Sequence, residues 1–143
     1  ASIYNMLEKA LPGKVTNVYA HQSGGGKYMA VLQCRKTVHT DEGKQRQAAL
    51  LAFSAFPELK HVILVDEDVD IFDTRDVLWA MNTRFQGDRD IITIPGVRCH
   101  PLDPSSDPVY KTIFDCTVPF ELKDKFARAK FMDIDEEKWK DFI

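Results

Sequence analysis

The residues best suited to chemistry in this chain are carboxylates that directly follow an apolar stretch. The stretch 61–65 has the sequence HVILV, and the acidic residues after it are Asp66, Glu67, Asp68, Asp70, Asp73 and Asp76. A D-x-D pair at the end of a buried strand can hold a divalent cation across a diphosphate, as in nucleotide-sugar transferases. Alternatively, such carboxylates cap backbone amides or form ion pairs, here with Arg75 and Arg84. The pattern alone leaves both interpretations open.

Two common ligand-binding loops do not fit the sequence. An EF-hand loop has glycine at its sixth position, whereas counting from Asp66 or Asp68 places Ile71 or Asp73 there. The stretch SGGGK at 23–27 lacks the first glycine of a phosphate-binding loop, and a tyrosine follows its lysine. It lies between two predicted strands, so we interpret it as a flexible hairpin connection.

Cysteine and histidine spacing indicates neither a disulfide nor a zinc site. The cysteines are Cys34, Cys99 and Cys116, an odd number without a close pair, which favours reduced thiols and a cytoplasmic setting. The histidines are His21, His39, His61 and His100, and they form no metal-binding motif with the cysteines. Cys99 and His100 are adjacent in an extended segment, where they would point in opposite directions. We expect His61, at the start of a strand, to be a hydrogen-bonded structural residue, and Cys34 and Cys116 to be core residues.

Composition favours one soluble domain over residues 1–143. The chain is 44% hydrophobic and 29% charged, with a formal net charge of −3. This charge and the absence of a basic stripe argue against a nucleic-acid partner. No apolar run approaches the ~20 residues of a membrane span, and the first residues do not resemble a signal peptide.

The elements that would position these residues alternate in type. Helix periodicity covers 3–11, 42–56 and 74–85, with Ser2, Thr40 and Thr74 as expected caps. Strand patterns cover 15–21, 27–36, 61–65, 90–94 and 111–119, and a proline-rich loop covers 95–110. The branched apolar stretch 61–65 is typical of a central strand buried on both faces. The expected fold is therefore α/β, with a mixed β-sheet flanked by helices and a charged tail after it.

The stretch 59–96 closely resembles the C-terminal domain of UbiD-family decarboxylases. Its sequence is LKHVILVDEDVDIFDTRDVLWAMNTRFQGDRDIITIPG, and the acidic-Trp-Arg pattern of the family is matched residue by residue. The stretches 11–36, 43–59, 100–105 and 111–119 are similar to the opening strand pair, a helix, the closing loop and the last strand of that domain. The resemblance thus covers nearly the whole chain.

This resemblance implies a part of a larger carboxy-lyase. UbiD-like enzymes are homo-oligomers that reversibly decarboxylate aromatic acids of the hydroxybenzoate type or α,β-unsaturated acids. They use prenylated FMN with a divalent metal (Mn or Mg) and potassium, bound mainly by an N-terminal domain that no segment of this chain resembles. The expected partners are that N-terminal domain, a second copy of the enzyme and the aromatic acid. We expect no decarboxylase activity from the isolated chain.

The resemblance also suggests one substrate-covering segment. In the family a leucine in the loop before the last strand covers the substrate, and VRCHPLDP at 97–104 is similar to that loop. Leu102 is therefore the expected lid residue, with Pro101 and His100 as its neighbours. A lysine that contacts the cofactor phosphate in some members is replaced here by Ser54, so no cofactor ligand, metal ligand or catalytic residue is assigned. The alternatives are a metal-dependent transferase fragment that uses Asp66–Asp70 and a non-catalytic assembly module.

Overall fold

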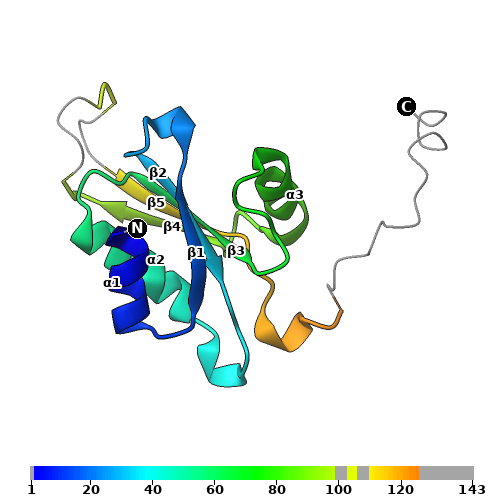
Figure 1. Ribbon diagram of the computed structural model, residues 1–143. Coiled ribbons are helices and arrows are strands. Elements are labelled where there is room, and N and C mark those ends of the chain that lie inside the picture. Colours follow the sequence, from blue (N-terminus) through cyan, green and yellow to red (C-terminus); the bar gives the residue numbers. More distant parts are fainter. Residues whose placement is uncertain (1, 99–102, 106–109, 126–143) are drawn as a thin grey trace, which may run out of the picture.

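Five strands form one twisted mixed sheet in a computed structural model, which describes residues 2–98, 103–105 and 110–125 (Figure 1). The strands are β1 (Val15–Ala20), β2 (Met29–Cys34), β3 (His61–Asp66), β4 (Ile91–Pro95) and β5 (Tyr110–Asp115). Their order across the sheet is β1-β2-β3-β5-β4. Strands β2, β3 and β5 run parallel, and the two edge strands pair antiparallel with their neighbours. The expected α/β fold with a mixed sheet is confirmed.

Strand β3 lies at the centre of the sheet because its side chains suit burial on both faces. It pairs in parallel with β2 on one side and β5 on the other. Val62, Ile63, Leu64 and Val65 are all buried, which confirms the prediction from the HVILV stretch. The carboxyl ends of β2, β3 and β5 meet at one end of the sheet, and their amino ends meet at the other.

Helices cover both faces of the sheet, as Figure 1 shows. Helices α1 (Ser2–Ala10) and α2 (Lys44–Ala55) lie on one face, where Leu7, Leu32 and Leu64 belong to the first hydrophobic core. Helix α3 (Thr74–Arg84) lies on the other face, over a second core around Val31 and Ile63. Short 3₁₀ helices occur at Gln22–Gly24, His39–Asp41 and Phe120–Leu122. Among the described residues, no helix has the length and apolar character needed to cross a membrane.

Several helices and strands begin or end at residues other than the predicted ones. Helix α3 is capped by Asp73, whose carboxylate accepts from the Arg75 amide, and not by Thr74. Helix α2 begins after Gly43, which has a φ of 98°, so the expected cap at Thr40 is wrong. Strand β5 ends at Asp115, well before the predicted end at 119. The predicted charged tail lies mostly outside the described residues.

The apolar residues of α3 at helical spacing predict one buried face, made of Val77, Leu78, Met81 and Phe85, and the structure differs from this prediction at a single position. Val77 is buried, and Met81 and Phe85 pack partly against the second core, as expected. Leu78, however, is 49% exposed. It follows Val77 by one residue, a rotation of about 100° on a helix, which turns it away from the sheet. Arg84 takes its place among the buried residues of this helix.

Asp41 holds the region between β2 and α2 and should make the stability of the chain pH-dependent. Its buried carboxylate accepts from Lys14 Nζ at 2.9 Å and from the Thr37 amide at 2.9 Å. These donors hold the pKa of Asp41 well below its ordinary value. The folded pKa is therefore below the unfolded pKa, and the stabilisation is complete at neutral pH and lost as the pH falls through the acidic range.

We expect Asp41→Asn to lower the free energy of unfolding by about 2 kcal/mol at pH 7. The difference from the unaltered chain should shrink at pH 3, because the unaltered chain has then lost part of the same contribution. Urea unfolding at both pH values measures this difference. The exposed control Glu121→Gln should change stability by less than about 0.5 kcal/mol. An equal loss at both pH values would contradict the assignment.

Candidate functional site

The acidic run after β3 is held by Arg84 of helix α3. The Arg84 guanidinium donates to Asp66 Oδ2 at 2.9 Å and to the two oxygens of Asp68 at 2.7 and 2.8 Å. The Arg84 side chain is only 4% exposed, and its guanidinium lies 4.9 Å from the centre of the Trp79 ring. Trp79 packs partly against the second core.

Of the other carboxylates of this run, Glu67 pairs with Arg35 at 3.0 Å, and the remaining three accept from backbone amides. Asp73 accepts from the Arg75 amide at 3.0 Å, and Asp70 accepts from the Phe72 amide at 3.0 Å. Asp76 accepts from the Asp70 amide at 2.7 Å. The structural interpretation of the run is therefore confirmed, with Arg84 as the ion-pair partner, whereas the Arg75 contact with the run is through its backbone amide.

Asp66 also joins the end of β3 to the segment after β5. Its Oδ2 atom accepts from the Val118 amide at 2.9 Å. Burial raises the pKa of Asp66, and this effect outweighs the opposing effects of the Val118 amide and Arg84. A carboxylate already shared between an amide and a guanidinium has little capacity left for a cation. In the described part of the chain, no group of three His, Cys, Asp or Glu side chains is placed to hold a metal ion.

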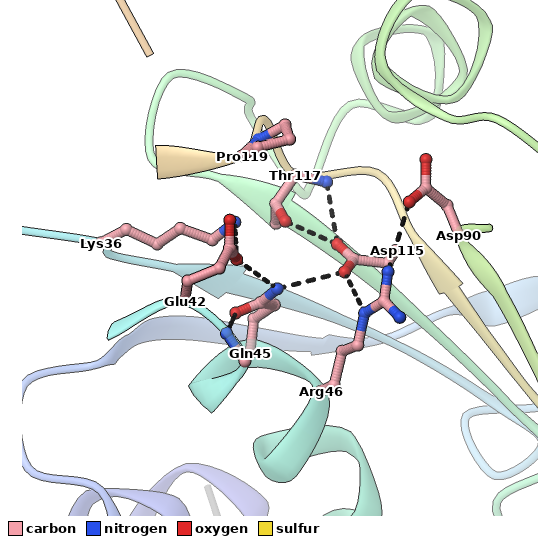
Figure 2. A pocket seen from close by; sticks show the side chains of 9 residues that line it. Lys36, Glu42, Gln45, Arg46, Asp90, Asp115, Thr117 and Pro119 are labelled. Atoms are coloured by element: carbon pink, nitrogen blue, oxygen red, sulfur yellow. Dashed lines mark hydrogen bonds and ion pairs between the residues drawn. The ribbon is translucent and has the colours of Figure 1, made fainter. Parts of the chain in front are cut away.

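A polar pocket of about 280 Å³ lies at the same end of the sheet, beside the start of α2 (Figure 2). Asp115, at the end of β5, is the centre of its hydrogen-bond network. One carboxylate oxygen accepts from Arg46 Nε at 2.7 Å and from Gln45 Nε2 at 3.1 Å. The other accepts from the Thr117 hydroxyl at 2.5 Å and the Thr117 amide at 3.1 Å. Arg46 also pairs with Asp90 at 3.2 Å. Asp115 thus ties α2, β5 and the start of β4 together.

The remaining charges of the pocket are also paired. Lys36 Nζ lies 2.7 Å from Glu42 Oε2 and donates to the Val118 carbonyl at 2.9 Å. Burial raises the pKa of Glu42, but its contacts with Lys36 and the Phe120 amide outweigh burial and hold it below the ordinary value. Since every carboxylate in this pocket has a cationic partner, none is poised as a general base. The network fixes the ends of the strands and contains no nucleophile–base pair.

The opposite end of the sheet, at the amino end of β3, carries a second polar cluster. Lys60 Nζ lies 2.8 Å from Asp103 Oδ2. The other Asp103 oxygen accepts from the Ser105 amide at 2.9 Å and from the Ser105 hydroxyl at 2.8 Å. The Lys60 ammonium and Ser105 hold the pKa of Asp103 well below its ordinary value. The cluster therefore fastens residues 103–105 to the strand end.

His61 lies next to this cluster and differs from the sequence expectation. Its Nδ1 atom is buried and makes no hydrogen bond with the described residues, so the prediction of a hydrogen-bonded structural histidine is wrong. Burial, helped by the neighbouring Lys60 ammonium, lowers the pKa of His61. Its ring lies 6.0 Å from the Phe114 ring, which explains the apolar surroundings.

Of the residues that the resemblance marked, only Ser54 lies among the residues that the structure describes. The expected lid residues His100, Pro101 and Leu102 lie outside the described residues. Ser54 is an exposed residue of α2, and its hydroxyl donates to the Leu50 carbonyl at 3.0 Å. The Lys60–Asp103 pair was missed from sequence. The D-P-S turn at 103–105 was a possible signal, but the partner lysine is far away in the chain.

The described thiols are core residues, as predicted. Cys34 and Cys116 are buried and free. Burial raises the pKa of Cys116 to about 12 and raises that of Cys34 as well. Neither thiol is therefore ionised enough at neutral pH to act as a nucleophile.

Comparison with known proteins gives a consistent result. The family model of the 3-octaprenyl-4-hydroxybenzoate carboxy-lyase C-terminal domain matches residues 1–116. Gallate decarboxylase of Lactiplantibacillus plantarum is 57% identical over 152 aligned residues, which cover 97% of this chain and 31% of that protein. The apo structure of 3,4-dihydroxybenzoic acid decarboxylase from Enterobacter cloacae superposes with a TM-score of 0.90 at 53% identity and covers 100% of this chain and 32% of that one.

A more distant solved structure shows the same fold. It is an evolved dimeric form of the UbiD-class enzyme HmfF from Pelotomaculum thermopropionicum in complex with prFMN, with a TM-score of 0.72 and 28% identity, over 99% of this chain and 28% of that chain. The chain spans about a third of the length of the relatives that it matches. The family model, the high identity and the shared fold together show that this chain belongs to the UbiD family and corresponds to its C-terminal domain.

Proposed function

We propose that this chain is the C-terminal domain of a carboxy-lyase that reversibly decarboxylates an aromatic acid of the hydroxybenzoate type. The observation that carries the proposal is the identity of 57% to a gallate decarboxylase and of 53% to a 3,4-dihydroxybenzoic acid decarboxylase, over nearly the whole chain. α,β-Unsaturated acids are the second substrate class, since the wider family also acts on them. The domain boundaries we propose are residues 1–143.

The cofactor of this reaction would be prenylated FMN with a divalent metal, Mn or Mg, and potassium. The HmfF relative was solved with prFMN. The described residues of this chain do not fit a role in metal binding, because no group of three His, Cys, Asp or Glu side chains among them is placed to hold an ion. Asp66 and Asp68 pair with Arg84, and the pocket carboxylates pair with Arg46 and Lys36. The cofactor and the metals would therefore be bound mainly by an N-terminal domain of the same enzyme.

The contribution of this chain to catalysis would be to close the active site. Decarboxylation produces carbanion character that water would quench, and an apolar lid excludes water. Leu102, flanked by Pro101 and His100, is the proposed lid residue. Residues 103–105, which follow the proposed lid residue in the sequence, are anchored at the amino end of β3.

The second proposed contribution is assembly into a homodimer or a higher homo-oligomer. Phe72 is 59% exposed, beside Tyr19, with the two ring centres 5.2 Å apart, and Leu78 is exposed on the same side of the sheet. Exposed apolar side chains of this kind suit a subunit contact.

The proposed location is a reducing, cytoplasmic one. The free, buried thiols of Cys34 and Cys116 agree with it.

Release of CO2 from gallate, 3,4-dihydroxybenzoate and 4-hydroxybenzoate tests the proposed function. The assay compares this chain alone, a cofactor-loaded N-terminal segment from the same source, and the two mixed. We expect release only from the mixture, because the reacting atoms and the lid would come from different segments. Turnover by this chain plus cofactor alone would contradict the proposal. A mixture that forms oligomers but releases no CO2 would favour the assembly module instead.

A further inference from the structure

We infer that two copies of this chain pair along the outer edge of β4, antiparallel and about Thr93, so that two five-stranded sheets join into one. The inference deepens the assembly into a homo-oligomer that the proposed function includes, because it names the surface of contact. It rests on the backbone groups of β4, on the residue at its centre and on the charges beyond its two ends.

The outer edge of β4 offers backbone groups that the described residues leave unused. β4 is an edge strand, and its one neighbour in the sheet is β5. The Asp115 amide donates to the Asp90 carbonyl at 2.9 Å, and bonded and non-bonded pairs alternate along an antiparallel ladder. Ile91, Thr93 and Pro95 therefore turn their backbone groups outward. Within the described part of the chain, neither of the two outward amides donates to an acceptor.

The other edge strand, β1, has two features that hinder pairing. Its register is irregular between Val15 and Asn17, and the Asn17 side chain accepts from the Val18 amide at 3.0 Å, which occupies that amide. Natural proteins protect edge strands with irregularities of this kind. The register of β4 is regular over Ile91–Pro95, and the strand has no charged side chain. A regular, uncharged and uncovered edge is suited to pairing with another strand.

A second copy of β4 fits this edge because the strand is complementary to itself. Antiparallel pairing about a twofold axis at Thr93 places Ile91 of each copy opposite Pro95 of the other. Each Thr93 amide then donates to the Thr93 carbonyl of the other copy, and each Ile91 amide donates to the Pro95 carbonyl. Pro95 has no amide hydrogen, so it leaves no donor unpaired. Thr93 is uncharged, so it avoids the repulsion that a charged residue would meet opposite its own copy.

The charges beyond the ends of β4 suit the same register. Asp88 and Arg98 lie equally far from Thr93 along the chain, on opposite sides of it. Both side chains are exposed, and neither has an ion-pair partner among the residues that the structure describes. The twofold arrangement brings Asp88 of one copy to the end of the contact where Arg98 of the other copy lies. This pair occurs twice, and opposite charges across an interface favour one register over its neighbours.

Pairing would also cover apolar surface. Ile91 is 41% exposed, on the face of β4 that points away from the first core. In the paired arrangement its side chain lies beside Pro95 of the other copy on that face. Because β4 is only five residues long, the contact is small, and we expect a dimer whose population depends on concentration.

Cysteine crosslinking of the full chain tests the register. Thr93→Cys places two thiols at the axis, where the Cα atoms of a bonded pair are about 5.5 Å apart, within the range of a disulfide. Ile91→Cys is the matched control on the same face of the strand, because its two copies would be about 14 Å apart. Mild oxidation should therefore give about tenfold more covalent dimer with Thr93→Cys than with Ile91→Cys or the unaltered chain. Equal crosslinking of the two variants, or none with either, would overturn the inference.

Sedimentation velocity of the full chain tests the charge pairs. Asp88→Lys and Arg98→Glu should each raise the dimer dissociation constant about tenfold, because each places two pairs of like charges in the contact. The double variant restores opposite charges and should recover the constant of the unaltered chain, which a folding defect would not allow. Single variants without effect, or a double variant as weak as the singles, would overturn the inference.

The same measurements separate this contact from the other proposals. Phe72→Ser should leave crosslinking through Thr93→Cys unchanged, because Phe72 lies beside Tyr19 of β1, at the other edge of the sheet. If Phe72→Ser abolishes that crosslinking, the β4 contact is refuted. Association needs neither cofactor nor substrate. If the chain pairs through β4 while no hydroxybenzoate releases CO2 from the mixture with the N-terminal segment, the proposed function fails and this inference stands.

Discussion

Replacing Arg84 with methionine should lower the free energy of unfolding of this chain by about 3 kcal/mol, the low end of the range for breaking a buried ion pair. The guanidinium is buried, and it is the shared donor to Asp66 and Asp68. Without it two neighbouring carboxylates would face each other beside the second core. The estimate is at the low end because Asp68 is 40% exposed, so water screens part of its charge.

Urea unfolding at several pH values measures this effect. Arg84 lowers the pKa of Asp66, so its removal should raise that pKa further. When the folded pKa of a carboxyl is above its unfolded pKa, the contribution of that group to the free energy of unfolding is most favourable at low pH. That contribution is lost as the pH rises through the folded pKa. The difference between Arg84→Met and the unaltered chain should therefore be largest near pH 7 and smallest near pH 4.

The control is Arg75→Met on the same helix, where the side chain is exposed. Its substitution should change the free energy of unfolding by less than about 0.5 kcal/mol. A loss for Arg84→Met no greater than that of the control would show that the ion pairs with Asp66 and Asp68 add no stability.

Leu102→Gly in the full-length enzyme should reduce turnover by about ten- to a hundredfold, the range seen when positioning of the reacting groups is disturbed. Removing the side chain admits water to the site where the carbanion character develops. Cofactor content should stay the same, because the proposal places the cofactor in the N-terminal domain. The result would separate a lid from a residue that only packs beneath its loop.

The measurement is the rate of CO2 release from the best hydroxybenzoate, together with the absorbance of the bound cofactor. Leu122→Gly is the control, since Leu122 is an exposed leucine in a short 3₁₀ helix. That control should retain the turnover of the unaltered enzyme. Equal turnover for Leu102→Gly and Leu122→Gly would remove the lid role.

The sequence by itself determined the fold class, the family and the type of most elements. The HVILV stretch specifies a central strand, because only a strand between two parallel neighbours buries so many branched apolar side chains on both faces. The helical patterns of α2 and α3 and the β-branched residues of the edge strand β4 reflect local geometry in the same way. The acidic-Trp-Arg pattern was long enough to identify the family, which the comparisons confirmed.

The tertiary structure decided which charges meet. Nothing in the sequence shows that Arg84, and not Arg75, reaches Asp66 and Asp68, because that choice depends on how α3 lies on the sheet. The pairs Arg46–Asp115 and Lys60–Asp103 join residues far apart in the chain, which meet only once parallel strands have brought their ends together. Local patterns indicate helical or strand periodicity and turns within a few residues. These contacts depend instead on the order of the strands in the sheet and on the direction in which each strand runs. The pattern of carboxylates after β3 was therefore compatible with both a metal site and a structural role. The folded structure shows the structural role, because these side chains pair with arginine or cap backbone amides.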